Sequence, residues 1–385
     1  MTDVFLVSGV RTPIGKFLGA LAGVRGPDLG ALVVREAVRR AGLAPEAVDE
    51  VLMGCVLQAG LGQNPARQAA LKGGLPPTVP ASTINKVCGS GLKAVIDAAR
   101  AIKAGDADVV VAGGMESMSN APYLAPDARR GARLGDAKLV DSMVHDGLWD
   151  VYNDFHMGTS CELVAERFKV SRAAMDEYSA HSHAKARAAS FKAELLPVAA
   201  DAKTTVEVDE GPRADSTVEK LAKLRPAFKP DGGVTAGNAS QLSDGAAALV
   251  VMSEAGLKKH KATPLARISG WAAAGVEPKW VLVSTIDAVK AFDVRNPWKA
   301  GQADLIEINE AFAASTIAAI QDLSLDPSKV NVNGGGIALG HPIGASGARI
   351  VVSLLHALAA RGQKRGVATL CMGGGNGLAL GVERL

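Results

Sequence analysis

Short apolar runs alternate along this chain with longer segments of helical periodicity. The short runs are rich in β-branched residues and cover residues 4–10, 51–56, 109–111, 304–308 and 367–371. The most regular of the longer segments has its apolar positions on one helical face, at Leu92, Val95, Ile96, Ala99 and Ile102. This alternation predicts α/β layers with mostly parallel strands.

Two further patterns concern domain organisation. Residues 119–242 are richer in charge, Met, His and Pro and have weaker strand signals, which predicts an inserted, irregular region. Elsewhere there is a faint internal repeat. A Ser-Gly pair at 90–91 precedes a helix, a strand and a glycine pair at 113–114, and a second Ser-Gly pair at 346–347 precedes the same series, ending in glycines 373–375. The repeat favours duplication of a half-domain, although two ordinary α/β turns would also produce it.

Composition narrows the class of protein. The 385 residues suit two or three domains, and 48% apolar with 21% charged residues is typical of a soluble globular protein. A net charge of +3, with both signs interspersed, predicts no nucleic-acid partner. The first apolar run reads as a strand rather than a signal peptide. No apolar run approaches the roughly 18 residues of a membrane span, so no membrane partner is expected.

The cysteines indicate a compartment and argue against a metal. They stand at positions 55, 88, 161 and 371, and none belongs to a C-x-x-C pair. We therefore expect no zinc or other metal site. The pattern does not resemble a secreted disulfide framework, and it predicts a reducing, cytoplasmic location.

Cys88 carries the strongest chemical signal. It lies in the run Asn-Lys-Val-Cys-Gly-Ser-Gly at 85–91, directly before the amphipathic segment. A cysteine at a helix N-terminus meets free backbone N–H groups that stabilise a thiolate or a developing oxyanion. The neighbouring glycines allow a substrate to approach the backbone closely. A buried structural cysteine is the alternative interpretation.

Three runs near the C-terminus add to this signal. His341 stands between Gly and Pro before an apolar helix, where it would be a neutral base or a turn-capping residue. Cys371 ends a strand, and the glycines after it could form an anion-binding turn. Asn309 follows the strand at 304–308, where it could face a ligand at the strand's carboxyl end or cap the next helix.

All four runs in this order resemble the thiolase family, and the similarity extends over nearly the whole chain. Residues 85–91 match its nucleophile motif, 309–312 its Asn-Glu-Ala-Phe motif, 340–347 its Gly-His-Pro motif and 371–377 its second-cysteine motif. The resemblance implies two similar five-stranded mixed-sheet α/β halves in an α-β-α-β-α arrangement, plus an inserted loop domain. We assign residues 1–118 with 243–264 to the first half, 119–242 to the loop domain and 265–385 to the second half.

The resemblance also implies roles for the site residues. Cys88 would be the acylated nucleophile, His341 would take its proton, and Cys371 would handle the proton at the substrate α-carbon. Asn309, through a bound water, and His341 would face the oxygen of the enolate. The backbone N–H groups of Cys88 and Gly373 would hold the other oxyanion. A Claisen condensation of thioesters needs this set, because it requires a covalent carrier, a base and two oxyanion sites.

Coenzyme A is expected as a substrate, with no permanently bound cofactor. His156 and Met157 resemble the His-Met-Gly segment of short-chain thiolases, in which the Met bounds the acyl pocket, although core packing alone would explain a Met here. Ser240 resembles the serine that meets the pantetheine, and Arg213 could pair with a CoA phosphate. The remaining expected substrate contacts are Leu148, Ala227, Phe228, Leu242, Ala311 and Phe312.

Two segments depart from the family pattern. Where most relatives have Met-Gly-x-Gly-Pro, this chain has Val-Leu-Val-Ser-Thr at 281–285. We expect the change to alter a loop near the acyl pocket, and Leu282 or Val283 there would narrow the pocket or shift the loop and widen it. Pro297 would break a surface helix. Lys220 near the expected CoA entrance would aid phosphate binding or be simply solvated.

The resemblance thus implies acetyl-CoA C-acetyltransferase activity, by a ping-pong mechanism through an acyl-Cys88 thioester. A thiolase of longer 3-ketoacyl-CoA is the alternative within the family. A ketoacyl-synthase-like enzyme and an inactive CoA-ester binding protein are two others. Family resemblance further suggests a homotetramer, with a place in fatty acid metabolism or polyhydroxybutyrate biosynthesis.

Overall fold

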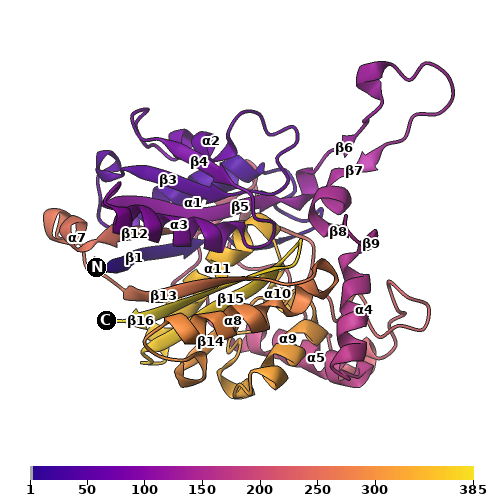
Figure 1. The fold of residues 1–385 in the computed structure, drawn as a ribbon. Coiled ribbons are helices and arrows are strands. Elements are labelled where there is room, and N and C mark those ends of the chain that lie inside the picture. Colours follow the sequence, from indigo (N-terminus) through magenta and orange to yellow (C-terminus); the bar gives the residue numbers. More distant parts are fainter. Residues whose placement is uncertain (1–2) are drawn as a thin grey trace.

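A single ten-stranded mixed sheet forms the framework of the protein in the computed structural model, which describes residues 3–385 (Figure 1). Its strands follow the order β14-β15-β16-β13-β1-β12-β5-β3-β4, with β2 (Gly15–Lys16) added beside β12. The first half of the chain supplies β1 (Val4–Arg11), β3 (Glu50–Gly54), β4 (Ala81–Ile84) and β5 (Val109–Ser117), together with β12 (Ser243–Ser253). The second half supplies β13 (Ala266–Gly275), β14 (Leu305–Ile308), β15 (Arg365–Met372) and β16 (Asn376–Arg384).

The expectation of mostly parallel strands is wrong. Only the pairs β3–β4, β3–β5 and β14–β15 run parallel among the described residues, and the other pairings of the large sheet are antiparallel. The reason lies in burial, because β12 is buried along its whole length. An antiparallel strand covered on both faces has the same continuous apolar pattern as a parallel one. The sequence pattern therefore could not show its direction.

The two halves repeat one topology, which supports duplication. The strands β3-β5-β12-β1 of the first half correspond in that order to β14-β15-β16-β13 of the second, and each neighbouring pair runs in the same relative direction as its counterpart. The second half has four continuous strands, and an isolated bridge between Ile306 and Val330 occupies the place that corresponds to β4. The halves join where Phe5 pairs with Arg267 and Leu6 with Ala266.

Two helices form the middle layer. These are α3 (Ser90–Ala104) and α11 (Ile343–Ala360), and they pack against each other and against strands of the sheet (Figure 1). The five apolar positions predicted on one face of α3 are all buried, as expected. A Cβ added at Gly91 would meet the backbone of α11, and one at Gly347 would meet the backbone of α3. The repeated Ser-Gly pairs thus mark the close crossing of these helices.

Helix α11 also corrects one expectation. With 18 residues and a mean hydropathy of 1.5, it has the length and composition of a membrane-crossing helix. Gly, Ser and Arg interrupt its apolar residues, so no uninterrupted apolar run of this length stands in the sequence. In this fold 83% of it is buried, as in the core helix of a globular protein.

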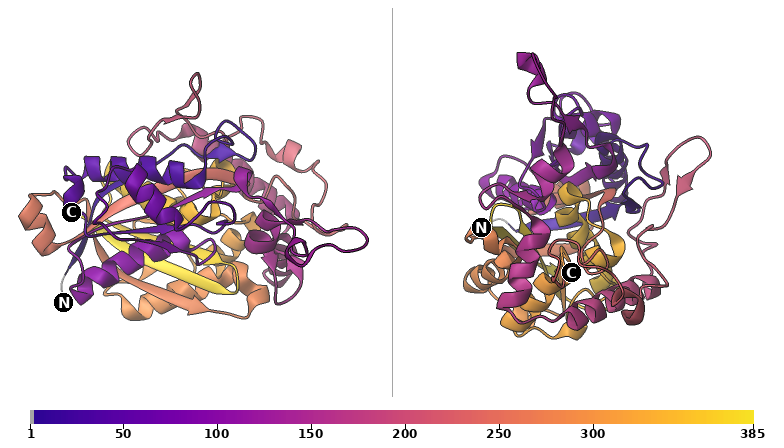
Figure 2. Two further views of the ribbon diagram at one scale, coloured as in Figure 1. Left: turned by 90° about the horizontal axis from the view of Figure 1, so that it is seen from above. Right: turned by 90° about the vertical axis from the view of Figure 1, so that its right-hand side faces the viewer.

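The halves of the sheet on either side of the β1–β13 junction form the two β layers around α3 and α11, and outer helices complete the α-β-α-β-α arrangement (Figure 2). Helix α1 (Gly26–Arg40) packs on β12 and β5, and α2 (Pro65–Lys72) packs on α1. Helix α8 (Ser284–Arg295) packs on β13 and β16, with α9 (Ala313–Asp322) beside it. Helix α8 ends at Arg295, shortly before Pro297, as the proline predicted. The smaller helices are α7 (Glu254–His260) and α10 (Gly336–Leu339).

Residues 119–242 contain two-residue strands and three helices, in agreement with their irregular pattern. The paired strands are β6 (Tyr123–Leu124) with β7 (Val140–Asp141), β8 (Trp149–Asp150) with β9 (Phe155–His156), and β10 (Val198–Ala199) with β11 (Thr205–Val206). The helices are α4 (Met157–Arg167), α5 (Arg172–Ala188) and α6 (Val218–Leu221). The segment that joins β6 to β7 projects far from the body (Figure 1). The domain boundaries themselves stay a prediction.

Candidate active site

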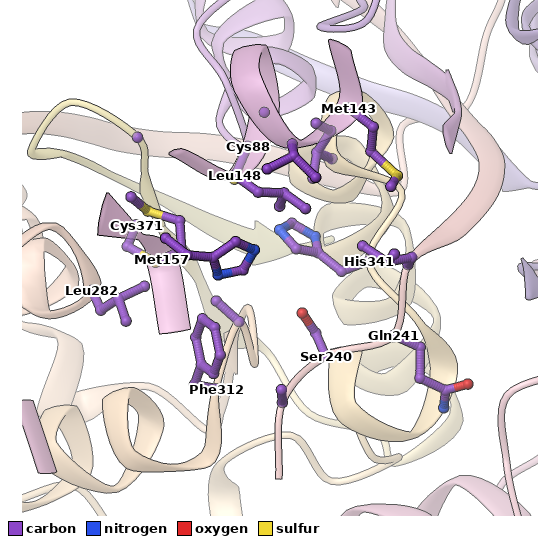
Figure 3. A pocket seen from close by; sticks show the side chains of 18 of the residues that line it. Cys88, Met143, Leu148, Met157, Ser240, Gln241, Leu282, Phe312, His341 and Cys371 are labelled. Carbon is purple, nitrogen blue, oxygen red and sulfur yellow. The ribbon is translucent and has the colours of Figure 1, made fainter. Parts of the chain in front are cut away.

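A cavity of about 410 Å³ lies where the loop region meets both halves, and it gathers most of the predicted site residues (Figure 3). Cys88, His341, Cys371 and Gly373 line it, although they come from widely separated parts of the sequence. The predicted substrate contacts that also line it are Leu148, His156, Met157, Ala227, Phe228, Ser240, Leu242, Ala311 and Phe312. Among residues 3–385, no cluster of His, Cys, Asp and Glu could hold a metal ion.

Cys88 is half-buried in a tight turn just before α3. Val87 adopts a positive φ of 49°, which a β-branched residue rarely does. The turn is held by Asn85, whose Oδ1 accepts the Val87 N–H at 3.0 Å, and by Ser90, whose Oγ donates to the Val87 carbonyl at 2.6 Å. At Gly89 a side chain would collide with Met372. The Cys-Gly-Ser-Gly sequence is therefore what this strained turn requires.

Burial decides the protonation state of Cys88. It raises the pKa of the thiol to about 11, although the backbone N–H groups of Gly373 and Cys88 act in the opposite direction. We expected the helix N-terminus to favour a thiolate, but in the unliganded protein desolvation outweighs this stabilisation and the thiol keeps its proton. The same two N–H groups lie close to the sulfur, where an oxyanion would form after attack on a carbonyl.

His341 is buried, and its ring faces the cavity rather than capping a turn (Figure 3). Its Nδ1 lies 2.6 Å from Oγ of Ser346, and its backbone N–H donates to the carbonyl of Gln241 at 3.0 Å. Burial, and secondarily the charge of Arg349, lowers the pKa of His341 to about 3. The imidazole is therefore neutral, as predicted, and both Cys88 and His341 are uncharged in the unliganded protein.

Cys371 lies at the end of β15, where the chain turns through Gly373–Gly375 into β16. Gly374 and Gly375 both have φ of +80°, and a Cβ at Gly375 would overlap the carbonyl of Val276. This close approach explains the glycine cluster. Burial, with a smaller contribution from Cys88, raises the pKa of the Cys371 thiol well above its usual range. Cys371 therefore carries its proton at rest.

Asn309 does not line the cavity, but its side chain lies next to the ring of His341. It follows β14 and its Nδ2 is 3.5 Å from both ring nitrogens. The alternative of a helix cap is excluded, since α9 begins at Ala313 with Phe312 as its N-cap. Oδ1 of Asn309 lies 3.5 Å from Nη2 of Arg349, which is buried on α11. This arrangement points the amide NH2 of Asn309 toward His341.

Two buried carboxylates escaped the sequence analysis. Glu310 accepts hydrogen bonds from Tyr178, Ser182, Asn331 and the backbone of Ile337, and so ties α5 to the second half. Glu116 accepts the N–H groups of Val56, Leu57 and Gly344 at 2.9–3.2 Å and joins the two halves beside the site. Burial nevertheless raises the pKa of Glu116 to about 7. In the sequence, Glu116 is marked only as a single acidic residue at the end of an apolar strand. Glu310 is marked only by its place in the Asn-Glu-Ala-Phe motif.

The expected CoA contacts divide into two groups. His156 stacks on Phe228 with ring centroids 4.8 Å apart, and its Nδ1 accepts the Gly158 N–H at 3.0 Å. Burial lowers the pKa of His156, so this end of the cavity is uncharged. Arg213, in contrast, is exposed and does not line the cavity, and its role toward a phosphate stays a prediction. Lys220 is exposed as well and pairs with Asp215 at 3.4 Å.

The divergent segment at 281–285 does reach the cavity. Val281 and Leu282 line it, whereas Val283 is buried behind them. Leu282 lies near Met157 and Cys371 (Figure 3). Sequence reasoning missed several other lining residues, and two of them, Met143 and Val144, belong to a π-helical turn over Met143–Leu148. Such turns are frequent at functional sites, but nothing in their sequence marks them.

Comparisons with known proteins agree with this geometry. The family description "Thiolase, N-terminal domain" matches residues 4–255, and "Thiolase, C-terminal domain" matches residues 262–384. The chain is 55% identical to an acetyl-CoA acetyltransferase of Cupriavidus necator and 51% identical to a probable acetyl-CoA acetyltransferase of Escherichia coli, in both cases over 100% of each protein. The crystal structure of the Bacillus anthracis acetyl-CoA acetyltransferase has a TM-score of 0.97 and 44% identity, covering 100% of this chain and 99% of that one. The chain belongs to the thiolase family.

Proposed function

We propose that this protein is an acetyl-CoA acetyltransferase, which condenses two acetyl-CoA into acetoacetyl-CoA and CoA or catalyses the reverse thiolysis. The observation that carries the proposal is the convergence of Cys88, His341 and Cys371 on one cavity, with the Gly373 backbone beside them. The names of full-length relatives at about half identity support the same reaction.

The neutral imidazole of His341 and the protonated thiols of Cys88 and Cys371 suit the thiolysis direction of the reaction. His341 is neutral and takes the proton of Cys88 as its sulfur attacks the 3-keto carbon of acetoacetyl-CoA. The backbone N–H groups of Cys88 and Gly373 stabilise the resulting oxyanion. The bond between carbons 2 and 3 then breaks, which leaves an acetyl group on Cys88 and the enolate of acetyl-CoA.

Cys371 and His341 complete the cycle. The Cys371 thiol, kept protonated by burial, gives its proton to the α-carbon of the enolate, and acetyl-CoA leaves. The Cys371 thiolate next takes the proton of an incoming CoA thiol, whose sulfur attacks the acetyl-Cys88 thioester. The Cys88 sulfur departs and recovers its proton from His341. Condensation is the same series in reverse, and both directions are ping-pong reactions.

CoA-dependent cleavage of acetoacetyl-CoA tests this function. Wild type should cleave acetoacetyl-CoA, and Cys88→Ala should be inactive. Cys161→Ala is a matched control because Cys161 is buried in the core and does not line the cavity. Full turnover by Cys88→Ala would refute the mechanism. Binding of acetyl-CoA without any cleavage by wild type would instead favour the inactive CoA-binding protein.

The substrate length and the setting of the enzyme belong to the same proposal. We propose acetoacetyl-CoA rather than a longer 3-ketoacyl-CoA, because bulky Leu282 and Val281 bound the cavity. We further propose a cytoplasmic homotetramer that serves fatty acid metabolism or polyhydroxybutyrate biosynthesis. Tyr123, Leu134 and Leu139 on the projecting β6–β7 segment support assembly, since they are large apolar side chains exposed on an extension that a partner surface would cover. Sedimentation equilibrium measures the assembly state.

A further inference from the structure

The catalytic histidine has a short contact that the reaction scheme does not use. Ser346 is completely buried in the first turn of α11, and its Oγ lies 2.6 Å from Nδ1 of His341. The same hydroxyl lies 2.9 Å from the carbonyl oxygen of Pro342, which also accepts the backbone N–H groups of Ala345 and Ser346. One side chain therefore connects the imidazole to the helix that follows it.

The position of the hydrogens follows from what each group can do. A carbonyl oxygen only accepts, so the contact with Pro342 uses the single hydrogen of the Ser346 hydroxyl. Oγ is then left with lone pairs for Nδ1, and the short contact requires Nδ1 to carry a hydrogen. Because the imidazole is neutral, Nε2 has no hydrogen and is free to accept one.

The remaining polar neighbours of the ring are compatible with this state. Nδ2 of Asn309 is 3.5 Å from both ring nitrogens and only donates, so it does not compete for a ring hydrogen. Arg349 contributes a positive charge that disfavours a doubly protonated ring. Among the described residues, Oγ of Ser346 is thus the one acceptor within hydrogen-bond distance of the His341 ring.

The other half of the molecule uses a serine in the same way. Ser90 occupies the corresponding place at the start of α3, before a glycine that packs on the opposite central helix. Its Oγ donates to the carbonyl of Val87 at 2.6 Å and accepts the backbone N–H of Lys86 at 2.8 Å. Each serine therefore donates to a backbone carbonyl and accepts an N–H from the loop that bears the reactive residue.

We propose that Ser346 is a positioning residue that holds His341 in the tautomer with hydrogen on Nδ1, so that Nε2 is the atom that takes the proton of Cys88. The inference rests on the proposed function for the identity of the proton donor. The assignment of the tautomer does not depend on the proposed function, because the tautomer is a property of the unliganded protein. The two can therefore fail separately.

The first test is 15N NMR of the wild-type enzyme labelled at histidine. Comparison with His341→Asn assigns the signals of His341 among the seven histidines. The expected spectrum at neutral pH has a protonated Nδ1 and an unprotonated Nε2. A His341 with hydrogen on Nε2 would overturn the proposal, whatever the activity of the Ser346 variants.

The second test combines three variants. Ser346→Ala should lose the Nδ1–H preference and lower kcat for acetoacetyl-CoA cleavage about tenfold, the equivalent of one hydrogen bond, with KM little changed. Ser346→Thr keeps a hydroxyl and should restore the tautomer and most of kcat. Ser353→Ala is the control, because Ser353 is buried on the same helix but bonds to Glu194 instead.

The outcomes separate positioning from mere packing. An unchanged kcat in Ser346→Ala would overturn the proposal. So would an equal loss of kcat in Ser346→Ala and Ser346→Thr if both variants keep the wild-type tautomer. If wild type shows the expected tautomer but does not cleave acetoacetyl-CoA, the proposed function fails and the tautomer assignment stands.

Discussion

Leu282 offers a quantitative test of how the divergent segment sets chain length. Its side chain is buried and lines the cavity beside Met157 and Cys371. Leu282→Ala removes three carbon atoms from the wall, which is room for the two extra methylenes of 3-ketohexanoyl-CoA. Burial of a methylene stabilises by about 0.8 kcal/mol, so two contribute about 1.6 kcal/mol. At 1.4 kcal/mol per factor of ten, this is about fifteenfold.

The assay is the ratio of kcat/KM for 3-ketohexanoyl-CoA to kcat/KM for acetoacetyl-CoA, measured for CoA-dependent cleavage. We expect Leu282→Ala to raise this ratio about fifteenfold. Val283→Ala is the matched control, because Val283 is buried next to Leu282 but does not line the cavity. An unchanged ratio in Leu282→Ala, or an equal rise in Val283→Ala, would show that this wall does not limit the acyl chain.

Three further predictions concern protonation and packing. Alkylation of Cys88 by iodoacetamide should rise with pH to an apparent pKa well above the usual 8.5 of a thiol, because burial disfavours the thiolate; a plateau below pH 7 would indicate a thiolate–imidazolium pair instead. Gly347→Ala should lower the free energy of unfolding by about 3 kcal/mol in urea titrations, since a Cβ there overlaps the backbone of α3, whereas Gly301→Ala, with open space around it, should change little. Burial raises the pKa of Glu307 to about 8 although Arg349, 3.5 Å away, lowers it, so Arg349→Met should keep Glu307 protonated to a higher pH than in wild type when the carboxyl group is followed by infrared titration; an unchanged titration would mean that the pair is not coupled.

Local patterns were sufficient wherever the physical cause was local. The 3.6-residue period after Ser90 predicted both a helix and its buried face, because amphipathicity is a property of successive residues. The Cys-Gly-Ser-Gly run predicted a cysteine at a helix start, because the positive φ of Val87 and the contact at Gly89 are features of one short turn. Pro297 predicted the end of α8 for the same reason.

Expectations failed where the cause was a distant partner. Strand direction in the sheet could not be predicted, since parallel and antiparallel strands buried on both faces have the same composition. Asn309 could have been a helix cap or a site residue, and only the position of His341 decided between them. Arg213 is exposed and does not line the cavity, and its contact with a CoA phosphate stays a prediction.

The sequence by itself determined the chemical groups of this protein: two cysteines, a histidine and an asparagine, each in a short run whose turn or helix start depends on adjacent residues. Only the tertiary structure brought Cys88, His341 and Cys371 to one cavity and made their resting state neutral. The physical reason is that desolvation and hydrogen-bond geometry depend on which distant segments exclude water from a group. No stretch of neighbouring residues contains that information.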